Sequence, residues 1–572
     1  MADNKVYSEF EKISVRRKQL QAQKEIPEWY TTQALIMFER KYSYKGETVK
    51  GAFERIANTL SKHYTVDQEL AKDKFFDIMW KGFLAPSTPV FCNTGTNRGL
   101  VVSCAGSYTD DSIVGFYDSY KETAVLSQEG FGTSSYLGDI RPRGTEISRG
   151  GQADGVVPVI DSFIDVTSKV SQGNTRRGQC ATYLPLDHGD FWEVCGYILK
   201  NSASVNIGWM LSAEVIAKLQ MGDEEMVNRF NKVMYLRCRT GKGYIWKPDT
   251  ANRMAPQAVK NSGIPIKASN LCVEIALPQD NHHTFTCVLS SLNLSKWDEF
   301  EEDTVFWSVA MLDCVVSEML TQSENLEGMQ KAVNFTKKSR ALGLGTLGFH
   351  TYLQEKMVPF DGLKAHLYNN IIFSELQEKS IEATKKLGSL FGEPEWCKGT
   401  GQRNATVNAI APNMSSAVLA GSVSQGIEPI VSNCYNQQSA AGELTRMNPS
   451  LISIMKDRGV YNLDVMDDLS INYEGSVQHV DWLTEEEKRV FKTAYEIDQK
   501  AILRMASVRQ TKIDQGQSLN LFCKADEKEE NIAELHKMAI LDPNIKGLYY
   551  LRSSRGIKAS TGKVVECTAC EG

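Results

Sequence analysis

The sequence predicts an α/β protein behind a helical N-terminal region, and a change of pattern along the chain supports this. The first 85 residues are rich in charge, and the apolar side chains of 67–83 recur at helical spacing before Gly82 and Pro86. From Ser87 to about Phe300, short apolar runs and glycine-rich turns alternate with helical stretches. Because strands that alternate with helices build α/β domains, we expect a sheet covered by helices here.

The later elements continue this pattern. The apolar runs 100–102 and 287–289 are typical of short buried strands whose ends carry functional side chains. A helical stretch from about 305 to 387 is interrupted by the glycine-rich segment 343–348, and a second α/β portion includes 403–430. No low-complexity linker or fixed-period repeat divides the chain, so we expect one large α/β domain.

The last part of the chain carries a signal for a helix start. Thr484-Glu-Glu-Glu487 has the spacing of a capping box. Apolar residues at core-facing spacing then predict one long helix: Val490, Ala494, Ile497, Ala501 and Met505. We place the boundaries at 1–85 for the helical region, 86–555 for the α/β domain and 556–572 for a flexible tail.

Composition restricts the class of protein. The 572 residues are 42% hydrophobic and 23% charged, which are ordinary globular values, and the formal net charge is −6. There is no basic footprint for nucleic acid, no apolar run long enough to span a membrane and no signal-peptide core. We therefore expect a soluble, cytoplasmic protein, in a bacterial cell or a virus-infected host cell.

The 13 cysteines favour redox chemistry over structural bridging. An odd count in a long chain argues against a disulfide-stapled scaffold, and one Cys-x-x-Cys pair is too few for a structural zinc site. We expect no metal ion bound by this chain. Most of the cysteines have no matched partner spacing and are interpreted as small buried apolar residues: Cys92, Cys180, Cys195, Cys238, Cys314, Cys397, Cys434 and Cys523.

Five cysteines have settings that indicate chemistry: Cys104 after Ser103, Cys272 between Asn270 and Glu274, Cys287, and the terminal pair Cys567 and Cys570. An amide two residues before Cys272 and a carboxylate two residues after it suit a reactive cysteine beside a hydrogen-bond donor and a general base. A terminal Cys-x-x-Cys suits electron exchange with another disulfide. Together they predict redox chemistry on a bound substrate.

From about residue 80 to its last residue, the chain resembles the large subunits of class I ribonucleoside-diphosphate reductases. Asn270-Leu-Cys-Val-Glu274 is similar to the Asn-x-Cys-x-Glu loop of that family. Further motifs follow in the family's order: Ser103-Cys104, Asp111-Ser-Ile-x-Gly, the loop 174–178, Cys287, Ser424-Gln-Gly-Ile-Glu-Pro429, Ile513-Asp-Gln-x-Gln-Ser-Leu-Asn520, Tyr549-Tyr550 and Cys567-x-x-Cys570. The resemblance implies a ten-stranded α/β barrel of two five-stranded parallel halves that run antiparallel, with the Cys272 loop inside.

The resemblance also implies reduction of ribonucleoside diphosphates to 2′-deoxyribonucleoside diphosphates. Cys272 would form a thiyl radical that takes a hydrogen atom from C3′ of the ribose, Glu274 would accept the 3′-hydroxyl proton, and Asn270 would orient that hydroxyl. Cys104 and Cys287 would supply the electrons and end as a disulfide, so their Cα atoms must approach to about 4.4–6.8 Å.

Electrons and the radical would reach the site by separate routes. By the same resemblance, Cys567 and Cys570 would reduce the internal disulfide and be reduced in turn by thioredoxin or glutaredoxin. Tyr549 and Tyr550 would carry the radical from the metal site of a separate small (β) subunit. No cofactor is then bound covalently to this chain.

Substrate phosphates need hydroxyls and free backbone N–H groups, and the segment after Pro412 is typical of a helix start that faces an anion. The family usually has small or hydroxylated residues there, so Asn413 and Met414 are departures. The substrate-binding residues implied by the resemblance are Ser87, Thr88, Ser103, Asn413, Met414, Ser415 and Ser416.

The resemblance places a regulatory site at the interface of a homodimer. A deoxynucleoside triphosphate or ATP, with Mg²⁺, would bind there as specificity effector, and a glycine-rich loop would pass its identity to the substrate site. The residues concerned are Asp111, Ser112 and Arg141 for the effector, and Gln172, Asn174 and Arg176 for the loop.

One departure concerns overall regulation. The first 80 residues contain nothing similar to the family's N-terminal nucleotide cone, so we expect dATP to act only as a specificity effector. Two other functions stay open: a cobalamin-dependent reductase of the same fold that needs no partner, and a non-catalytic nucleotide-binding regulatory protein. The second predicts no deoxynucleotide product in a reconstituted mixture.

Overall fold

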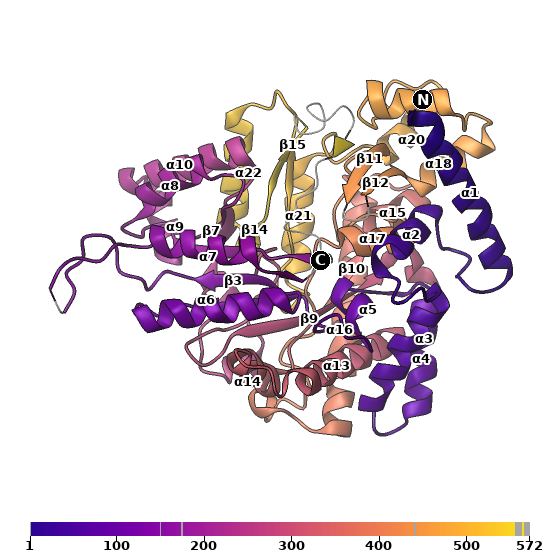
Figure 1. Cartoon of the computed structure of the whole chain (residues 1–572). Coiled ribbons are helices and arrows are strands. Elements are labelled where there is room, and N and C mark those ends of the chain that lie inside the picture. The colour runs from indigo at the N-terminus through magenta and orange to yellow at the C-terminus, as the bar shows by residue number, and fades with distance from the viewer. Residues whose placement is uncertain (1, 149, 173–175, 440–441, 555–562, 565–572) are drawn as a thin grey trace.

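Helices and strands alternate along the chain in a computed structural model that describes residues 2–148, 150–172, 176–439, 442–554 and 563–564 (Figure 1). The helices are α1 (Ala2–Ala22), α2 (Thr32–Met37), α3 (Val49–Leu60), α4 (Gln68–Trp80), α5 (Thr88–Asn93), α6 (Ile113–Gln128), α7 (Val157–Lys169), α8 (Phe191–Lys200), α9 (Ala213–Met221), α10 (Glu224–Thr240), α11 (Pro248–Arg253), α12 (Gln257–Lys260), α13 (Thr304–Ser323), α14 (Gln330–Ser339), α15 (Phe349–Glu355), α16 (Leu363–Phe391), α17 (Met414–Leu419), α18 (Pro449–Asp457), α19 (Leu463–Asp467), α20 (Glu485–Val490), α21 (Gln499–Gln510) and α22 (Glu529–Leu541).

The strands are β1 (Leu84–Pro86), β2 (Cys104–Tyr108), β3 (Gly132–Tyr136), β4 (Ser171–Gln172), β5 (Arg176–Arg177), β6 (Cys180–Pro185), β7 (Asn206–Met210), β8 (Tyr244–Trp246), β9 (Phe285–Asn293), β10 (Leu342–Leu347), β11 (Cys434–Ser439), β12 (Gly442–Met447), β13 (Leu521–Cys523), β14 (Gly547–Leu548), β15 (Leu551–Ser553) and β16 (Lys563–Val564).

Helices α1–α4 form the predicted N-terminal region and lie together on one side of the molecule (Figure 1). α4 begins after Asp67, whose side chain accepts a hydrogen bond of 3.0 Å from the Leu70 N–H. It buries Phe75, Ile78 and Met79, as the apolar spacing predicts. β1 then joins this region to the barrel by pairing antiparallel with β9.

The strands trace a closed ring with two halves. β2, β3, β6, β7 and β8 are parallel neighbours in that order, and β9 pairs antiparallel with β2. β10 lies parallel to β9, and single parallel bridges join Leu344 to Asn408 and Ile410 to Gln517. β13 pairs parallel with β15, and β14 pairs antiparallel with β8, which completes the ring. The fold is therefore the expected α/β barrel, with two parallel halves that meet antiparallel.

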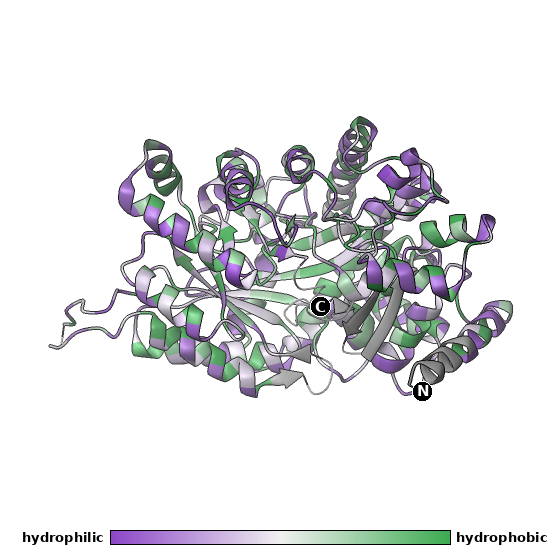
Figure 2. Ribbon diagram, turned by 90° about the horizontal axis from the view of Figure 1, so that it is seen from above, coloured by the Kyte–Doolittle hydropathy of each residue, from purple (hydrophilic) through white to green (hydrophobic). Residues whose placement is uncertain are grey.

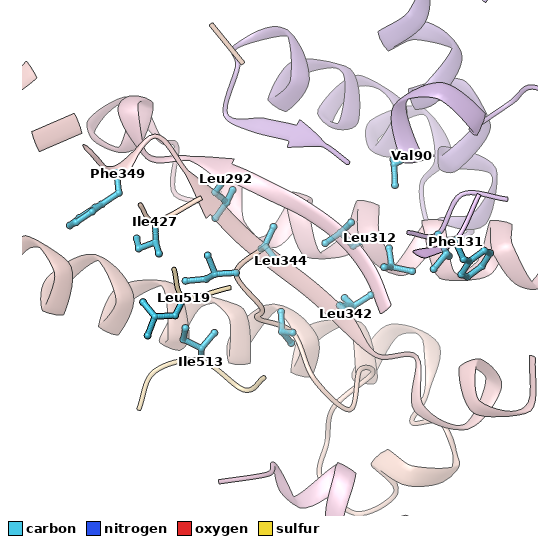
Figure 3. Close-up of a cluster of buried hydrophobic side chains, with 14 of the residues drawn as sticks. Val90, Phe131, Leu292, Leu312, Leu342, Leu344, Phe349, Ile427, Ile513 and Leu519 are labelled. Atoms are coloured by element: carbon cyan, nitrogen blue, oxygen red, sulfur yellow. The ribbon is translucent and has the colours of Figure 1, made fainter. Parts of the chain in front are cut away.

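Strand alternation separates an inner cluster of side chains from an outer one. In β9, Cys287 and Leu289 belong to the inner cluster, whereas Val288 and Leu292 belong to the outer layer under the helices. In β10, Leu342 and Leu344 face outward. They belong to the same outer cluster as Leu292 of β9 and Leu312 of α13 (Figure 3). The inner cluster holds Cys104, Cys272 and Cys287, so these three thiols are enclosed by the barrel.

Glycine at position 343 leaves room for the inner cluster. A Cβ atom at Gly343 would lie 2.9 Å from Cys287 Sγ and 2.5 Å from Leu289 Cδ2. At Gly345 it would lie 2.5 Å from the Ala409 carbonyl oxygen. The segment 343–348, expected to interrupt a run of helices, is thus mostly strand β10, and its glycines permit close packing of neighbouring strands.

Helices surround the strands, and hydrophobic and hydrophilic residues alternate along the helices (Figure 2). Among the described residues, α13 is the one helix long and apolar enough to span a membrane, but 72% of its most apolar window is buried within the protein. α13 is accordingly a core helix against β9 and β10 (Figure 1).

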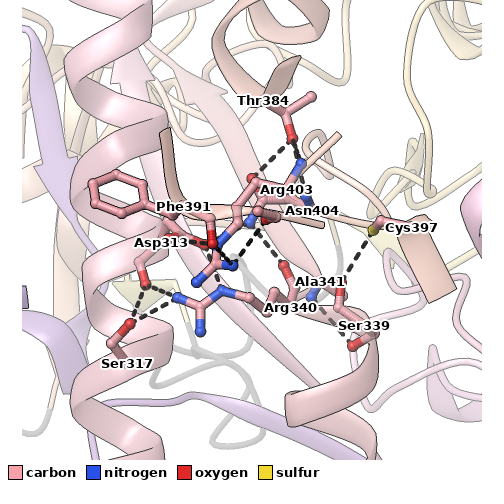
Figure 4. A network of polar contacts seen from close by, with 11 residues as sticks. Asp313, Ser317, Ser339, Arg340, Ala341, Thr384, Phe391, Cys397, Arg403 and Asn404 are labelled. Atoms are coloured by element: carbon pink, nitrogen blue, oxygen red, sulfur yellow. Dashed lines mark hydrogen bonds and ion pairs between the residues drawn. The ribbon is translucent and has the colours of Figure 1, made fainter. Parts of the chain in front are cut away.

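A buried polar network fixes α13 to the start of β10 (Figure 4). Arg340 donates from Nε to Asp313 Oδ1 at 2.8 Å and from Nη2 to the Asp313 carbonyl at 2.7 Å. Asn404 Nδ2 donates to the same Oδ1 at 2.8 Å. Burial alone would raise the pKa of Asp313, but Arg340 and Arg403 hold it below its usual value. The network positions the strand that carries Gly343.

The sequence prediction is wrong about one long helix after residue 484. The capping box between Thr484 and Glu487 is present, but α20 ends at Val490, and α21 begins only at Gln499. Between them, the Ala494 N–H donates to the Ile430 carbonyl at 2.8 Å, which holds the chain in a non-helical conformation. The run 100–102 is also not a strand, because β2 begins at Cys104.

Candidate active site

Cys104 and Cys287 lie directly opposite each other where the two barrel halves meet. They are Cα partners in the antiparallel ladder between β2 and β9. Opposite residues in such a ladder have Cα atoms about 4.5–5.5 Å apart, within the range of about 4.4–6.8 Å that a disulfide needs. Both are buried free thiols. The register therefore brings the two cysteines within the Cα range of a disulfide.

The loop from Asn270 to Ile275 enters the barrel between α12 and β9 and carries Cys272. Asn270 Oδ1 accepts hydrogen bonds of 3.1 Å from the N–H groups of Glu274 and Ile275, which closes the loop. Tyr183 Oη donates to the Asn270 carbonyl at 2.6 Å. Asn270 Nδ2 donates to Cys104 Sγ at 3.4 Å, so the loop touches the cysteine pair directly.

Val273, next to Cys272, has φ of +68°, a left-handed conformation that is unusual for a β-branched residue. Two glycines allow close contact with this loop. A Cβ at Gly516 would lie 3.0 Å from the Glu274 carbonyl oxygen, and one at Gly547 would lie 2.7 Å from Val273 Cγ1. The Gly516 N–H donates to the Glu274 carbonyl at 2.7 Å, so the surrounding chain maintains the strained backbone.

Ser518 connects Cys272 and Glu274 of the loop. Its Oγ lies 2.7 Å from the Cys272 carbonyl oxygen and 3.1 Å from Glu274 Oε2. Glu274 is only 1% exposed, and burying a carboxylate is costly unless it accepts hydrogen bonds. Ser518 thus orients the carboxylate beside Cys272, as a general base requires.

Three tyrosines lead to Cys272. Tyr549 Oη donates to Cys272 Sγ at 3.6 Å. The rings of Tyr549 and Tyr550 have centroids 4.1 Å apart and are inclined at 50°. The ring centroids of Tyr244 and Tyr549 are 5.0 Å apart, and Tyr244 Oη is 3.3 Å from Tyr550 Oη. Adjacent residues in a strand would point to opposite faces, but these tyrosines lie between β14 and β15, where their rings meet.

Cys287 has a fixed amide donor. Gln515 Nε2 lies 3.4 Å from Cys287 Sγ. Burial raises the pKa of the Cys287 thiol well above its usual value, the Gln515 hydrogen bond acts to lower it, and the Glu274 charge raises it. Cys287 is therefore a thiol at neutral pH before any reaction.

Most of the residues predicted to bind substrate phosphates lie near the part of β9 that pairs with β1. Ser103 Oγ donates to Ser87 Oγ at 3.4 Å, and Ser416 Oγ donates to the Pro86 carbonyl at 3.3 Å. Asn413 Nδ2 donates to Ser291 Oγ at 2.8 Å, four residues along β9 from Cys287. Thr88 Oγ1 lies 2.7 Å from Tyr42 Oη. Met414 and Ser415 begin α17 beside them and are buried.

Asn413 departs from the expected cap. It precedes α17 with φ of +57°, and its side chain makes no capping hydrogen bond to that helix. Its amide instead bonds to Ser291, Thr346 and Ala411. Asn413 thus ties α17 to β9 and β10.

The residues predicted to bind an effector lie at the start of α6. Ser112 is the N-cap, and its Oγ accepts a hydrogen bond of 3.0 Å from the Gly115 N–H. Arg141 Nε pairs with Asp111 Oδ2 at 2.5 Å. Three apolar side chains on the same end of α6 are exposed: Ile113, Val114 and Tyr117.

The comparisons with known proteins agree with this arrangement. The ribonucleotide reductase barrel domain matches residues 102–209, 213–396 and 394–551, and the ribonucleotide reductase all-alpha domain matches 28–99. The chain belongs to the ribonucleotide reductase large-subunit family. It is thus an oxidoreductase, and a large subunit implies a small-subunit partner and an oligomeric assembly.

Individual relatives cover nearly the whole reductase chain. A putative ribonucleoside-diphosphate reductase large subunit of Frog virus 3 is 32% identical over 90% of this chain and 95% of its own. The large subunit of Invertebrate iridescent virus 3 is 30% identical over 94% and 98%. The class Id ribonucleotide reductase alpha subunit of Actinobacillus ureae superposes with a TM-score of 0.85 at 34% identity, over 92% of this chain and 97% of that one.

Some predicted residues are not placed. Asn174, Cys567 and Cys570 lie outside the described residues. Gln172 and Arg176 belong to the paired strands β4 and β5, of which the structure gives only the backbone. Their roles stay predictions.

Sequence reasoning missed four residues of the reductase site: Tyr183, Tyr244, Gln515 and Ser518. Gln515 and Ser518 belong to the motif Ile513–Asn520, which indicated the family but not what each side chain contacts. Tyr183 and Tyr244 lie on strands β6 and β8, and no local pattern separates them from ordinary core tyrosines. An alternating inward position on a barrel strand is the signal that could have found them.

Proposed function

We propose that the chain is the catalytic α subunit of a class I ribonucleoside-diphosphate reductase that works by thiyl-radical chemistry at Cys272. The contact of 3.6 Å between Tyr549 Oη and Cys272 Sγ carries this proposal. It gives the cysteine a neighbour that can remove its hydrogen atom, while Cys104 and Cys287 stand ready as reductants nearby.

The radical step begins with removal of the hydrogen atom at C3′ of the ribose by the Cys272 sulfur. Glu274 takes the 3′-hydroxyl proton, while Asn270 orients that hydroxyl. With the radical at C3′, the Cys104 thiol protonates the 2′-hydroxyl, which leaves as water. Cys272 finally returns the hydrogen atom to C3′, and Glu274 returns its proton to the 3′-oxygen, so both residues are unchanged after a turnover.

Two electrons and two protons come from Cys104 and Cys287. Each turnover converts one ribonucleoside diphosphate and two thiols into one deoxyribonucleoside diphosphate, one water and one disulfide. The raised pKa of Cys287 keeps it protonated beforehand. Cys567 and Cys570 then reduce the disulfide by thiol–disulfide exchange and pass the oxidation to thioredoxin or glutaredoxin.

The tyrosines favour a radical that arrives from outside the chain. Tyr550, Tyr549 and Cys272 form a continuous series of contacts. A metal site in a small subunit would supply the radical to Tyr550, and Tyr549 would pass it to the cysteine. Adenosylcobalamin would need no such series.

Binding and regulation follow the same scheme. The hydroxyl and amide groups around Ser87, Ser103 and Asn413 would hold the diphosphate, with the ribose toward Cys287. A deoxynucleotide with Mg²⁺ would bind at Asp111, Ser112 and Arg141, and the exposed apolar end of α6 would be covered by the second subunit of a homodimer.

A reconstitution assay tests the proposal. The reductase is mixed with a metal-loaded small subunit, or with adenosylcobalamin alone, and deoxycytidine diphosphate is measured. Activity should require the small subunit and fall by at least about a thousandfold in Tyr549→Phe, because phenylalanine cannot carry the radical. Tyr30→Phe is a matched control, since Tyr30 is also buried and its hydroxyl has no hydrogen-bond partner among the described residues.

The other outcomes would reject parts of the proposal. Turnover with adenosylcobalamin alone would identify the cobalamin-dependent subclass. Unchanged product formation in Cys272→Ser would reject thiyl chemistry. Absence of product in every mixture would favour a non-catalytic nucleotide-binding protein.

A further inference from the structure

Gln515 is a buried amide held in one orientation against Cys287. Its Oε1 accepts a hydrogen bond of 3.1 Å from the Ala276 N–H, so the two protons on Nε2 must face the other way. The two protons are shared among three acceptors: the Leu342 carbonyl at 2.8 Å, Thr406 Oγ1 at 3.1 Å and Cys287 Sγ at 3.4 Å. The side chain cannot rotate to offer its oxygen to the sulfur without losing these bonds.

The backbone of Gln515 is held as firmly as its side chain. Its carbonyl accepts from Lys546 Nζ at 2.6 Å and from Gln510 Nε2 at 2.7 Å, and its N–H donates to the Asn408 carbonyl at 3.1 Å. Gln515 is 0% exposed. Such a group can act on Cys287 without any rearrangement, which is what preorganised electrostatic stabilisation needs.

The sulfurs of Cys104 and Cys287 accept hydrogen bonds from different amides, and only one of these amides has another proposed role. Cys104 Sγ receives its hydrogen bond from Asn270 Nδ2, a group that the proposed function also assigns to the substrate hydroxyl. Cys287 receives its bond from Gln515, which has no other proposed task. The two sulfurs also differ in access, because Cys104 is 4% exposed and Cys287 is 0% exposed.

We infer that Gln515 directs re-reduction of the internal disulfide, so that reductant attacks Cys104 and Cys287 leaves as the thiolate. The inference rests on the proposed function, in which these two cysteines form the disulfide. A thiolate of a dithiol bonds to Cys104 Sγ, the bond between the two protein sulfurs breaks, and its electron pair goes to Cys287 Sγ. The Gln515 N–H stabilises that charge.

The exchange balances without a further reactant. Cys287 takes a proton released by the dithiol, and the second thiol of the dithiol displaces Cys104. The protein disulfide becomes two thiols, and the dithiol becomes a disulfide. A leaving thiolate is released faster when it is better stabilised, and this one forms in a buried place near the Glu274 carboxylate. The Gln515 amide therefore stabilises a thiolate that burial and the Glu274 charge both disfavour.

The test isolates this exchange in a full-length chain that carries Cys567→Ser and Cys570→Ser, so that the tail cannot take part. One turnover with the small subunit and no reductant loads the disulfide. Dithiothreitol is then added, and the remaining disulfide is followed by thiol alkylation and mass spectrometry. Gln515→Met should slow its reduction about tenfold or more, the effect of losing a hydrogen bond to a charged group.

Thr406→Val is the matched control. It removes another acceptor of the same amide but leaves the Cys287 contact, so reduction should stay within about twofold of the parent chain. Gln515→Glu is the second test variant if Gln515→Met does not fold, because glutamate keeps an oxygen that can accept from the Ala276 N–H. It should also slow reduction, since a carboxylate beside Cys287 opposes a thiolate.

A monothiol probe identifies the sulfur under attack. With 2-mercaptoethanol, the mixed disulfide should be trapped on Cys104. Equal reduction rates in the parent and Gln515→Met, or trapping on Cys287, would overturn the inference. If the parent forms no disulfide between Cys104 and Cys287 after a turnover, the proposed electron source is wrong, and the inference falls with it.

Discussion

Replacing Ser518 by alanine tests whether the carboxylate of Glu274 must be held in place for catalysis. The hydroxyl lies 2.7 Å from the Cys272 carbonyl oxygen and 3.1 Å from Glu274 Oε2, and its single proton serves one of them at a time. Losing a hydrogen bond to a charged group costs about 1.5–3 kcal/mol. At about 1.4 kcal/mol per tenfold, we expect the turnover rate of Ser518→Ala to fall by about 10- to 150-fold.

The loss of stability in Ser518→Ala should be limited to the value of the one hydrogen bond removed. The loop keeps the hydrogen bond from Tyr183 Oη to the Asn270 carbonyl and the one from the Gly516 N–H to the Glu274 carbonyl. We therefore expect the free energy of unfolding to fall by no more than about 1–3 kcal/mol. Turnover is measured as initial rates with saturating substrate and small subunit, and unfolding by urea titration.

The pH dependence separates positioning from general damage. A hydrogen bond to the carboxylate favours its charged form, so the acid limb of the pH–rate profile should move to higher pH in Ser518→Ala. Ser127→Ala is the control, because Ser127 is buried and its hydroxyl has no partner among the described residues. Turnover of Ser518→Ala within twofold of the parent, with the acid limb in place, would refute the reasoning.

Three further predictions concern neighbouring parts of the protein. Gly343→Ala places a Cβ 2.9 Å from Cys287 Sγ, so urea titration should show a loss of about 1–3 kcal/mol, and turnover should fall; an unchanged midpoint would contradict the packing argument. Burial raises the pKa of Glu428 from 4.5 to about 7, so the folded protein holds a proton that the unfolded chain releases in this range. Stability should therefore fall as pH rises from about 4.5 to 7, and Glu428→Gln should flatten that slope in unfolding midpoints measured across it. Asp111→Asn removes the ion pair with Arg141 and should weaken binding of a deoxynucleotide effector about tenfold in equilibrium dialysis, with stability changed by less than about 1 kcal/mol; undiminished affinity would place the effector elsewhere.

The general fold could be predicted from the sequence where local patterns agree with long-range packing. The helical spacing over 67–83 and the capping box at 484–487 depend on neighbouring residues, and the structure has α4 over Gln68–Trp80 and the capping box. The prediction of one long helix after 484 is wrong because the Ala494 N–H donates to the Ile430 carbonyl. No local sequence signal predicts that distant partner. The glycine-rich segment 343–348 predicts an interruption of a helical stretch, whereas the structure has strand β10 there, and Gly343 makes room for Cys287.

The candidate site likewise has residues that local motifs predict and contacts that they do not. The motif around Cys272 indicated the reacting loop, and the structure brings Asn270, Glu274 and Cys104 together around it. The supporting contacts of Gln515 and Ser518 could not be predicted, because they depend on how distant strands align across the barrel. Spacing along the chain carries no information on such alignment.

The antiparallel junction of β2 and β9 has a consequence for the history of this protein. Side chains alternate between the two faces of a strand, so inserting or deleting one residue in either strand would turn one sulfur out of the barrel. Mutations that change the length of these strands are therefore excluded, while the loops at their ends are free to vary. Lineages that diverged widely in sequence should still share this one alignment.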